Sequence, residues 1–141
     1  MRYPLDFRPD QNNTIIAQSV DVPAALTMGN DEADAVEQAA DALITLFAYF
    51  MAEGEPIPQP SAPRPGQPCA VLPPTVAAKL AIYEAMRRQG LTQTALAARL
   101  GCDPRQVRRL LDLDHASTLA QLERALAALG KRLMLEVKDA A

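Results

Sequence analysis

The residues with the clearest chemical potential are three arginines and a glutamine within five positions, Arg105, Gln106, Arg108 and Arg109. A guanidinium group can hold a guanine edge or a phosphate through two hydrogen bonds, and a glutamine amide can pair with adenine. If these residues lie on a helix that buries the apolar residues among them, all four side chains turn outward. The pattern predicts a surface that binds the major groove of DNA, and the alternative is an ordinary solvated basic face.

Residues for enzymatic chemistry are scarce. His115 is the only histidine, and the chain has neither a glycine-rich phosphate loop nor a serine or cysteine nucleophile with a base. Asp6, Asp10 and Asp21 could be placed around a divalent metal as in a nuclease, but scattered acids on a small domain are usually solvated. We therefore expect a protein that is not an enzyme and that needs no cofactor or metal.

Two short capped helices must position the arginines. Thr92 is a strong N-cap for the first helix, and Gly101 is suited to its end. Asp103 and Pro104 are typical of the start of the second helix, after a turn of about three residues. This is a helix-turn-helix pattern. The expected DNA-binding residues, including backbone donors at the start of the first helix, are Thr92, Gln93, Thr94, Arg105, Gln106, Arg108 and Arg109.

Helices are also expected on both sides of this pair. One covers residues 75–89, with Thr75 as its cap and Gly90 at its end. Another begins at Ser117 or Thr118 and ends near Gly130. The inner faces are expected to be formed by Val76, Leu80, Tyr83 and Met86 in the first and by Leu119, Leu122, Leu126 and Leu129 in the second.

The C-terminal segment alternates in the manner of a strand over residues 132–138, where Leu133, Leu135 and Val137 are the apolar members. A single strand beside helices would leave unpaired edges. We expect it to pair with the same strand of a second copy, which gives a two-fold homodimer that suits a palindromic operator. The alternative is a frayed tail.

The N-terminal residues predict a small sheet. Tyr3, Leu5 and Phe7 alternate with polar or proline positions as in a strand with one buried face. Residues 11–13 supply a turn, because asparagine tolerates left-handed backbone, and residues 14–22 form the returning strand. A third short strand is expected at 26–29.

A helix that begins after Asp31 should cover this sheet. Leu46 and Tyr49 lie off its main apolar stripe, so its second half is expected to be buried on two sides, either in a deeper core or in a protein interface. The stripe itself is expected to comprise Val36, Ala40, Leu43, Ile44, Phe47, Phe50 and Met51.

Composition divides the chain near its middle. Residues 1–60 contain two basic against ten acidic residues, a net charge of −8, and residues 61–141 contain 12 against seven, a net charge of +5. Most of the prolines lie between these halves, where they favour an extended, semi-rigid linker. The expected domains are 1–62, with a possible last strand at 69–72, a linker at 63–74 and a DNA-binding and dimerisation domain at 75–141.

The cysteines and apolar runs bear on the cellular compartment. Cys69 and Cys102 lack the spacing of a metal knuckle or a redox pair, which favours a reduced cytoplasmic setting. The longest apolar run, residues 42–52, is about half the ~20 residues needed to cross a bilayer. No membrane association is expected.

Several short motifs occur in an order that resembles a known family. Residues 21–29, the acidic helix start at 30–36, and residues 54–61 resemble the N-terminal domain of HicB antitoxins. The resemblance implies an α+β protein with a strand–strand–strand–helix–strand unit, a partial RNase H-like fold, whose last strand would be Cys69–Leu72. It also implies a protein partner, the HicA toxin, a small ribonuclease that cleaves messenger RNA. An acidic domain suits such a cationic partner, and the candidate toxin contacts are Asp21, Leu46 and Tyr49.

Residues 75–132 resemble the Xre/lambda-repressor-like class, and residues 79–86 with 109–115 resemble the version fused to HicB domains. His115 then lies in the loop after the recognition helix, where it touches phosphate or packs the loop. The leading hypothesis is an antitoxin that neutralises a HicA-type toxin and represses its own operon by binding double-stranded operator DNA. The alternatives are a stand-alone helix-turn-helix regulator with a ligand-binding or oligomerising N-terminal domain, and a nuclease with RNase H-type chemistry.

Overall fold

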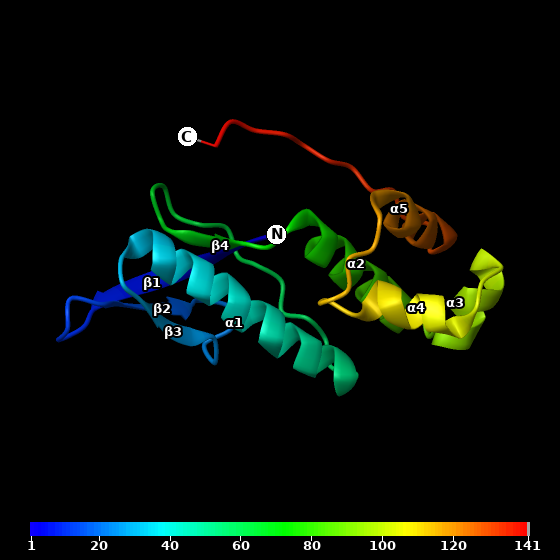
Figure 1. Ribbon diagram of the computed structural model, residues 1–141, viewed down its shortest axis with the longest axis horizontal. Helices are drawn as coiled ribbons and strands as arrows, with labels where there is room; N and C mark the ends of the chain where they lie inside the picture. The colour runs from blue at the N-terminus through cyan, green and yellow to red at the C-terminus, as the bar shows by residue number, and fades with distance from the viewer. Residues whose placement is uncertain (141) are drawn as a thin grey trace. The chain divides into compact units, whose positions relative to one another are not determined.

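Four strands and five helices form the chain in the computed structural model, which describes residues 1–140 (Figure 1). The structure divides into one unit of Met1–Ala77 and a second that begins at Ala78. The first contains β1 (Arg2–Pro9), β2 (Ile15–Ser19), β3 (Leu26–Gly29), α1 (Glu32–Ala52) and β4 (Cys69–Val71). The second contains most of α2 (Pro74–Gln89), then α3 (Gln93–Leu100), α4 (Pro104–Leu111) and α5 (Leu119–Ala128). The predicted α+β class and the strand–strand–strand–helix–strand order are confirmed.

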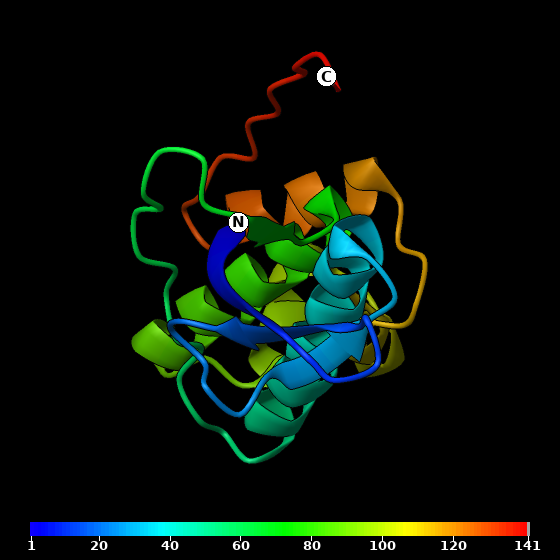
Figure 2. The ribbon, with the colours of Figure 1, turned by 90° about the vertical axis from the view of Figure 1, so that its left-hand side faces the viewer.

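The sheet of the first unit is antiparallel with strand order β3-β2-β1-β4. Asn13 closes the β1–β2 turn with φ at 57°, the left-handed geometry expected of asparagine there. Tyr3 pairs with Ala70 and Leu5 with Ser19, and all four are buried. Figure 2 shows α1 lying along one face of the strands.

The buried stripe of α1 differs from the predicted one. Asp31 caps the helix as expected, since its side chain accepts from the backbone N–H of Asp34 at 2.8 Å. The fully buried positions, however, are Ala35, Ala39, Leu43 and Phe47, and the predicted Val36, Ala40, Ile44, Phe50 and Met51 are only half-buried. A Cβ atom at Gly29 would overlap the backbone of Ala35, so β3 and α1 touch backbone to backbone. Such close contact leaves room for alanine but not for larger side chains.

The proline-rich segment is bonded to the sheet. The Tyr3 hydroxyl donates to the Pro58 carbonyl at 2.8 Å, and the backbone N–H of Leu5 donates to the Pro68 carbonyl at 2.8 Å. Prolines lack an N–H but keep their carbonyl oxygens, which serve here as acceptors. Residues 63–74, the expected linker, thus lie within the first unit and include β4.

The second unit is built around an apolar core to which all four of its helices contribute. The core residues are Ala78, Ile82, Ala85, Met86, Leu96, Ala97, Val107, Leu110, Leu122, Ala125, Leu126 and Leu129. Two predicted inner positions differ. Leu119 is 42% exposed because it is the first residue of α5, and Tyr83 is only half-buried while Ile82 is fully buried beside it.

Residues 131–140 form neither helix nor strand (Figure 1). A strand is defined by hydrogen bonds to a neighbour, and within the described part of this single chain none pairs with the tail. Leu133 packs against the core, whereas Leu135 is 56% and Val137 96% exposed. The predicted strand is therefore not formed within one chain, and its pairing with a second copy stays a prediction.

One helix has the length and composition of a membrane span. α1 has 21 residues and a mean hydropathy of 1.2 in its most apolar window. The apolar run counted from the sequence was shorter because it stops at Asp41. A helix in the core of a folded domain can have the same length and hydropathy as a membrane span. α1 packs on β2, β3 and β4.

Candidate nucleic-acid interface

Helices α3 and α4 are capped as the sequence predicts. The Thr92 side chain accepts from the backbone N–H of Ala95 at 3.1 Å, and Gly101 ends α3 with φ at 65°. The Asp103 carboxylate accepts from the backbone N–H of Arg105 at 2.8 Å, and Pro104 occupies the first turn of α4. Three residues therefore separate two eight-residue helices, and each end has its own cap.

All seven candidate DNA-binding residues are exposed. Val107 and Leu110 are buried under α4, which leaves Arg105, Arg108 and Arg109 on its open side. The guanidinium of Arg105 lies 3.5 Å from the Asp103 carboxylate, an ion pair in which the arginine side chain remains 73% exposed. Thr92, Gln93 and Thr94 are exposed at the start of α3, and Gln106 is exposed on α4. The residues thus come from the start of α3 and from the open face of α4.

The end of α4 is fixed by a residue that sequence reasoning missed. Lys79 of α2 is only 1% exposed, and its Nζ donates to the carbonyls of Arg109, Asp112 and His115 at 2.8, 2.7 and 2.8 Å. All three ammonium protons are therefore used. Burial lowers the pKa of Lys79, and the nearby carboxylate of Asp112 opposes that shift.

This contact orients α4 from behind. Lys79 ties the last turn of α4 and the following loop to α2, and a cation favours the negative end of a helix dipole. The available signal was its spacing: Lys79 stands three residues from Val76 and three from Ile82 on the buried side of α2.

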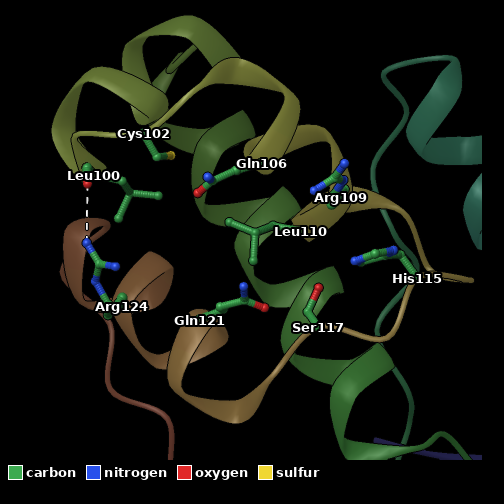
Figure 3. A pocket seen from close by; sticks show the side chains of 9 residues that line it. All are labelled: Leu100, Cys102, Gln106, Arg109, Leu110, His115, Ser117, Gln121 and Arg124. Carbon is green, nitrogen blue, oxygen red and sulfur yellow. Dashed lines mark hydrogen bonds between the residues drawn. The ribbon is translucent and has the colours of Figure 1, made fainter.

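A pocket adjoins the open face of α4 (Figure 3). Gln106 and Arg109 border it from α4, and His115 borders it from the loop after that helix. His115 is exposed in that loop, as the family resemblance implies. Ser117, Gln121 and Arg124 complete its polar wall and were not among the predicted site residues.

The candidate toxin contacts lie in the first unit. Tyr49 is 60% exposed on α1, and Leu46, one turn before it, is half-buried. Asp21 lies in the loop after β2, and its carboxylate accepts from both the N–H and the hydroxyl of Ser61, at 2.9 and 3.1 Å. Asp21 therefore holds the proline-rich segment in place, and Tyr49 is the most accessible of the three.

The three acids considered for a nuclease site are engaged separately. The Asp10 carboxylate accepts from Gln11 and Thr14 in its own turn, and Asp6 lies 3.8 Å from Arg64. Within residues 1–140, no group of three or more His, Cys, Asp or Glu side chains is placed to share a metal ion. The described part of the chain thus does not gather these carboxylates into one site.

The two units carry opposite charge. Residues 1–77 contain three basic and ten acidic residues, and residues 78–141 contain eleven and seven. The arginines of α4 thus lie in the unit with a net positive charge, which suits a polyanion, and the acidic first unit suits a cationic protein.

Comparison with known proteins covers nearly the whole chain. Residues 2–81, more than half of it, match the family model described as a HicB-like antitoxin of bacterial toxin–antitoxin systems. Antitoxin HicB of Escherichia coli is 36% identical over 135 residues, which are 96% of this chain and 98% of that protein. Antitoxin HicB 1 of Photorhabdus laumondii is 34% identical over 138 residues, 98% of this chain and 88% of that protein. Antitoxin HicB of Pseudomonas fluorescens is 29% identical over 132 residues, with coverages of 93% and 90%.

Proposed function

The chain belongs to the HicB-like antitoxin family, and from that membership we propose that it neutralises a HicA-type toxin with its acidic first unit and represses its own operon with α3 and α4. In this proposal α3 and α4 form a helix-turn-helix, and α4 enters the major groove of operator DNA. The first unit is a partial RNase H-like domain that binds protein and carries out no catalysis.

The proposed DNA binding rests on one observation, the placement of Arg105, Arg108 and Arg109 on the open side of a capped helix. Arginines on one short helix reach base edges and phosphates together, whereas a buried or self-paired set would not. The ion pair of Arg105 with Asp103 leaves that arginine largely exposed, so it does not block DNA contact.

Arg108→Ala tests the proposed DNA binding. We expect operator affinity, measured by fluorescence anisotropy at fixed salt, to fall by about 1–3 kcal/mol if the side chain reads a base, and its salt dependence to weaken if it holds a phosphate. Arg88→Ala is the matched control, because Arg88 is an exposed arginine of α2 whose neighbour is Glu84. Equal affinity of the Arg108 variant and the wild type would contradict the assignment of α4.

The proposed toxin binding rests on the acidic charge of the first unit and on the exposed Tyr49. Aromatic residues that are exposed in a free protein are common anchors of protein interfaces. We expect a small basic protein to co-purify with the chain from its native host, and Tyr49→Ala to weaken that complex more than Thr45→Ala, an exposed position one turn away. Recovery of operator DNA but of no protein partner would favour the stand-alone regulator instead.

A further inference from the structure

The pocket beside α4 has a volume of about 160 Å³ and is bordered by α4, the loop after it and α5. Leu100, Cys102 and Leu110 form the apolar part of its lining. Drug-sized ligands occupy pockets of roughly 300–1,000 Å³, so this one suits a smaller guest.

The polar wall of the pocket is rich in hydrogen-bond donors. Two arginines, Arg109 and Arg124, contribute to it together with the amides of Gln106 and Gln121, and none of the lining residues is a carboxylate. Donor-only guanidinium groups without a facing acid create a positive potential, which a concave surface concentrates. The wall therefore selects an anion.

Ser117 adds a further donor to the pocket. The residue is only 8% exposed, and Figure 3 shows its hydroxyl directed toward the pocket. Within the described residues no buried side-chain oxygen or nitrogen lacks a hydrogen-bond partner, so this hydroxyl does not require a ligand in order to be satisfied. A serine hydroxyl that faces the pocket can donate to an oxygen of a bound anion.

The donors also surround the space from several elements. Gln106 and Arg109 come from α4, His115 and Ser117 from the loop, and Gln121 from α5. The pocket lies by the first turn of α5, whose positive dipole end follows the capping residue Thr118. Donors that converge from different directions suit a tetrahedral group with several acceptor oxygens.

We infer that this pocket binds a small anion that carries a phosphate group, and that the bound anion weakens the grip of α4 on operator DNA. The second part rests on the proposed function, because Gln106 and Arg109 belong both to the pocket and to the candidate DNA surface. An anion held by these side chains occupies donors that DNA would otherwise use and adds negative charge beside the groove.

The test is an NMR titration of the full chain with inorganic phosphate, against sodium chloride of equal ionic strength. We expect saturable amide shifts at Gln106, Ser117 and Gln121 with phosphate only. Ser117→Ala and Arg124→Gln should each weaken phosphate binding by about tenfold, the effect of one lost hydrogen bond to a charged group.

Arg99→Gln is the matched control. Arg99 and Arg124 are both exposed, and each donates from its guanidinium to a backbone carbonyl at 3.2 Å, Arg99 to Ala128 and Arg124 to Leu100. Only Arg124 lines the pocket, so Arg99→Gln should leave phosphate affinity unchanged. Equal losses in both variants would show that net charge alone attracts phosphate and would overturn the inference.

A second arm distinguishes a free anion from the DNA backbone. Phosphate should lower the operator affinity of the wild type more than chloride does, and Arg124→Gln should remove the difference. If free phosphate gives no saturable shift while Arg124→Gln still weakens operator binding, the pocket takes a backbone phosphate and the small-anion inference is wrong. If phosphate binds but the wild type binds no operator, the pocket stands and the proposed repressor function fails.

Discussion

At the scale of single residues, the second unit depends on one buried charge. The Lys79 side chain reaches from α2 to the end of α4 and the following loop, and its three hydrogen bonds join segments that are 30 to 36 positions apart in the sequence. A lysine in a core is costly unless its charge is compensated, and three carbonyl acceptors provide that compensation. Lys79 is therefore a positioning residue for α4 and does not itself reach the open face.

Lys79→Met should destabilise the second unit. The substitution leaves three carbonyls without their donor, so we expect the free energy of unfolding to fall by at least about 2 kcal/mol in urea denaturation. Amide hydrogen exchange should accelerate over residues 109–115 before it does elsewhere in the unit. Ile82→Val in the same helix is the control, since it removes one buried methyl group for about 1 kcal/mol and leaves the carbonyls bonded. An unchanged denaturation midpoint for the lysine variant would contradict this role.

At the scale of elements, the proline-rich segment is held to the sheet by a side chain from the first strand. Burial raises the pKa of Tyr3 above its ordinary value near 10, and the carboxylate of Asp21 adds to the shift. Above pH 10, the unfolded chain loses this proton while the folded chain keeps it. The contribution of Tyr3 to stability is thus present below about pH 10 and is lost as the pH rises further.

Tyr3→Phe should remove that pH dependence. At neutral pH it deletes the 2.8 Å bond to Pro58 and should cost about 1 kcal/mol of unfolding free energy. Between about pH 8 and about pH 11, wild-type stability should fall more steeply than that of the variant, as measured by urea denaturation at each pH. Tyr49→Phe serves as the control because Tyr49 is 60% exposed. Parallel pH profiles for wild type and Tyr3→Phe would refute the assignment.

Local pattern and capping chemistry predicted most of the elements. Asp31, Thr92, Asp103 and Thr118 all act as N-caps. These caps could be predicted because a capping bond joins residues two or three positions apart, within a short stretch of sequence. The exposed arginines of α4 followed from the same local reasoning, since Val107 and Leu110 fix which side is buried.

Contacts between different elements account for what the pattern missed. The buried alanines of α1 reflect the close approach of Gly29, and hydropathy favours larger residues over alanine when a buried stripe is chosen. From the sequence alone Lys79 is expected at the surface, because its carbonyl partners are not visible there. Ser117 is a candidate site residue only because it lines the pocket. The partners of Lys79 lie 30 to 36 positions away, beyond any local window.

At the scale of the whole molecule, the two units carry opposite charge, and the proposed function gives each unit a different partner. The first unit has seven more acidic than basic residues, and the second has four more basic than acidic ones. One chain can therefore attract a cationic protein and a polyanion at the same time without the two competing for one surface. Both associations should weaken as salt rises.

Under the proposed function, the exposed tail bears on the number of copies that would bind an operator. Leu135 and Val137 leave apolar side chains in water, and a backbone that lacks ladder partners can pair with an identical strand. Leu135→Asp combined with Val137→Asp should therefore convert a dimer into a monomer in multi-angle light scattering, because like charges would face each other across the new ladder. Operator affinity should fall in the same variant, since a monomer binds only one half-site of a palindrome.

The control replaces Glu136 and Lys138 with alanine, which removes their 3.8 Å ion pair but leaves the apolar positions intact. A wild-type chain that is monomeric at every concentration would rule out pairing through the tail, and a charged variant that remains dimeric would place the two-fold interface elsewhere.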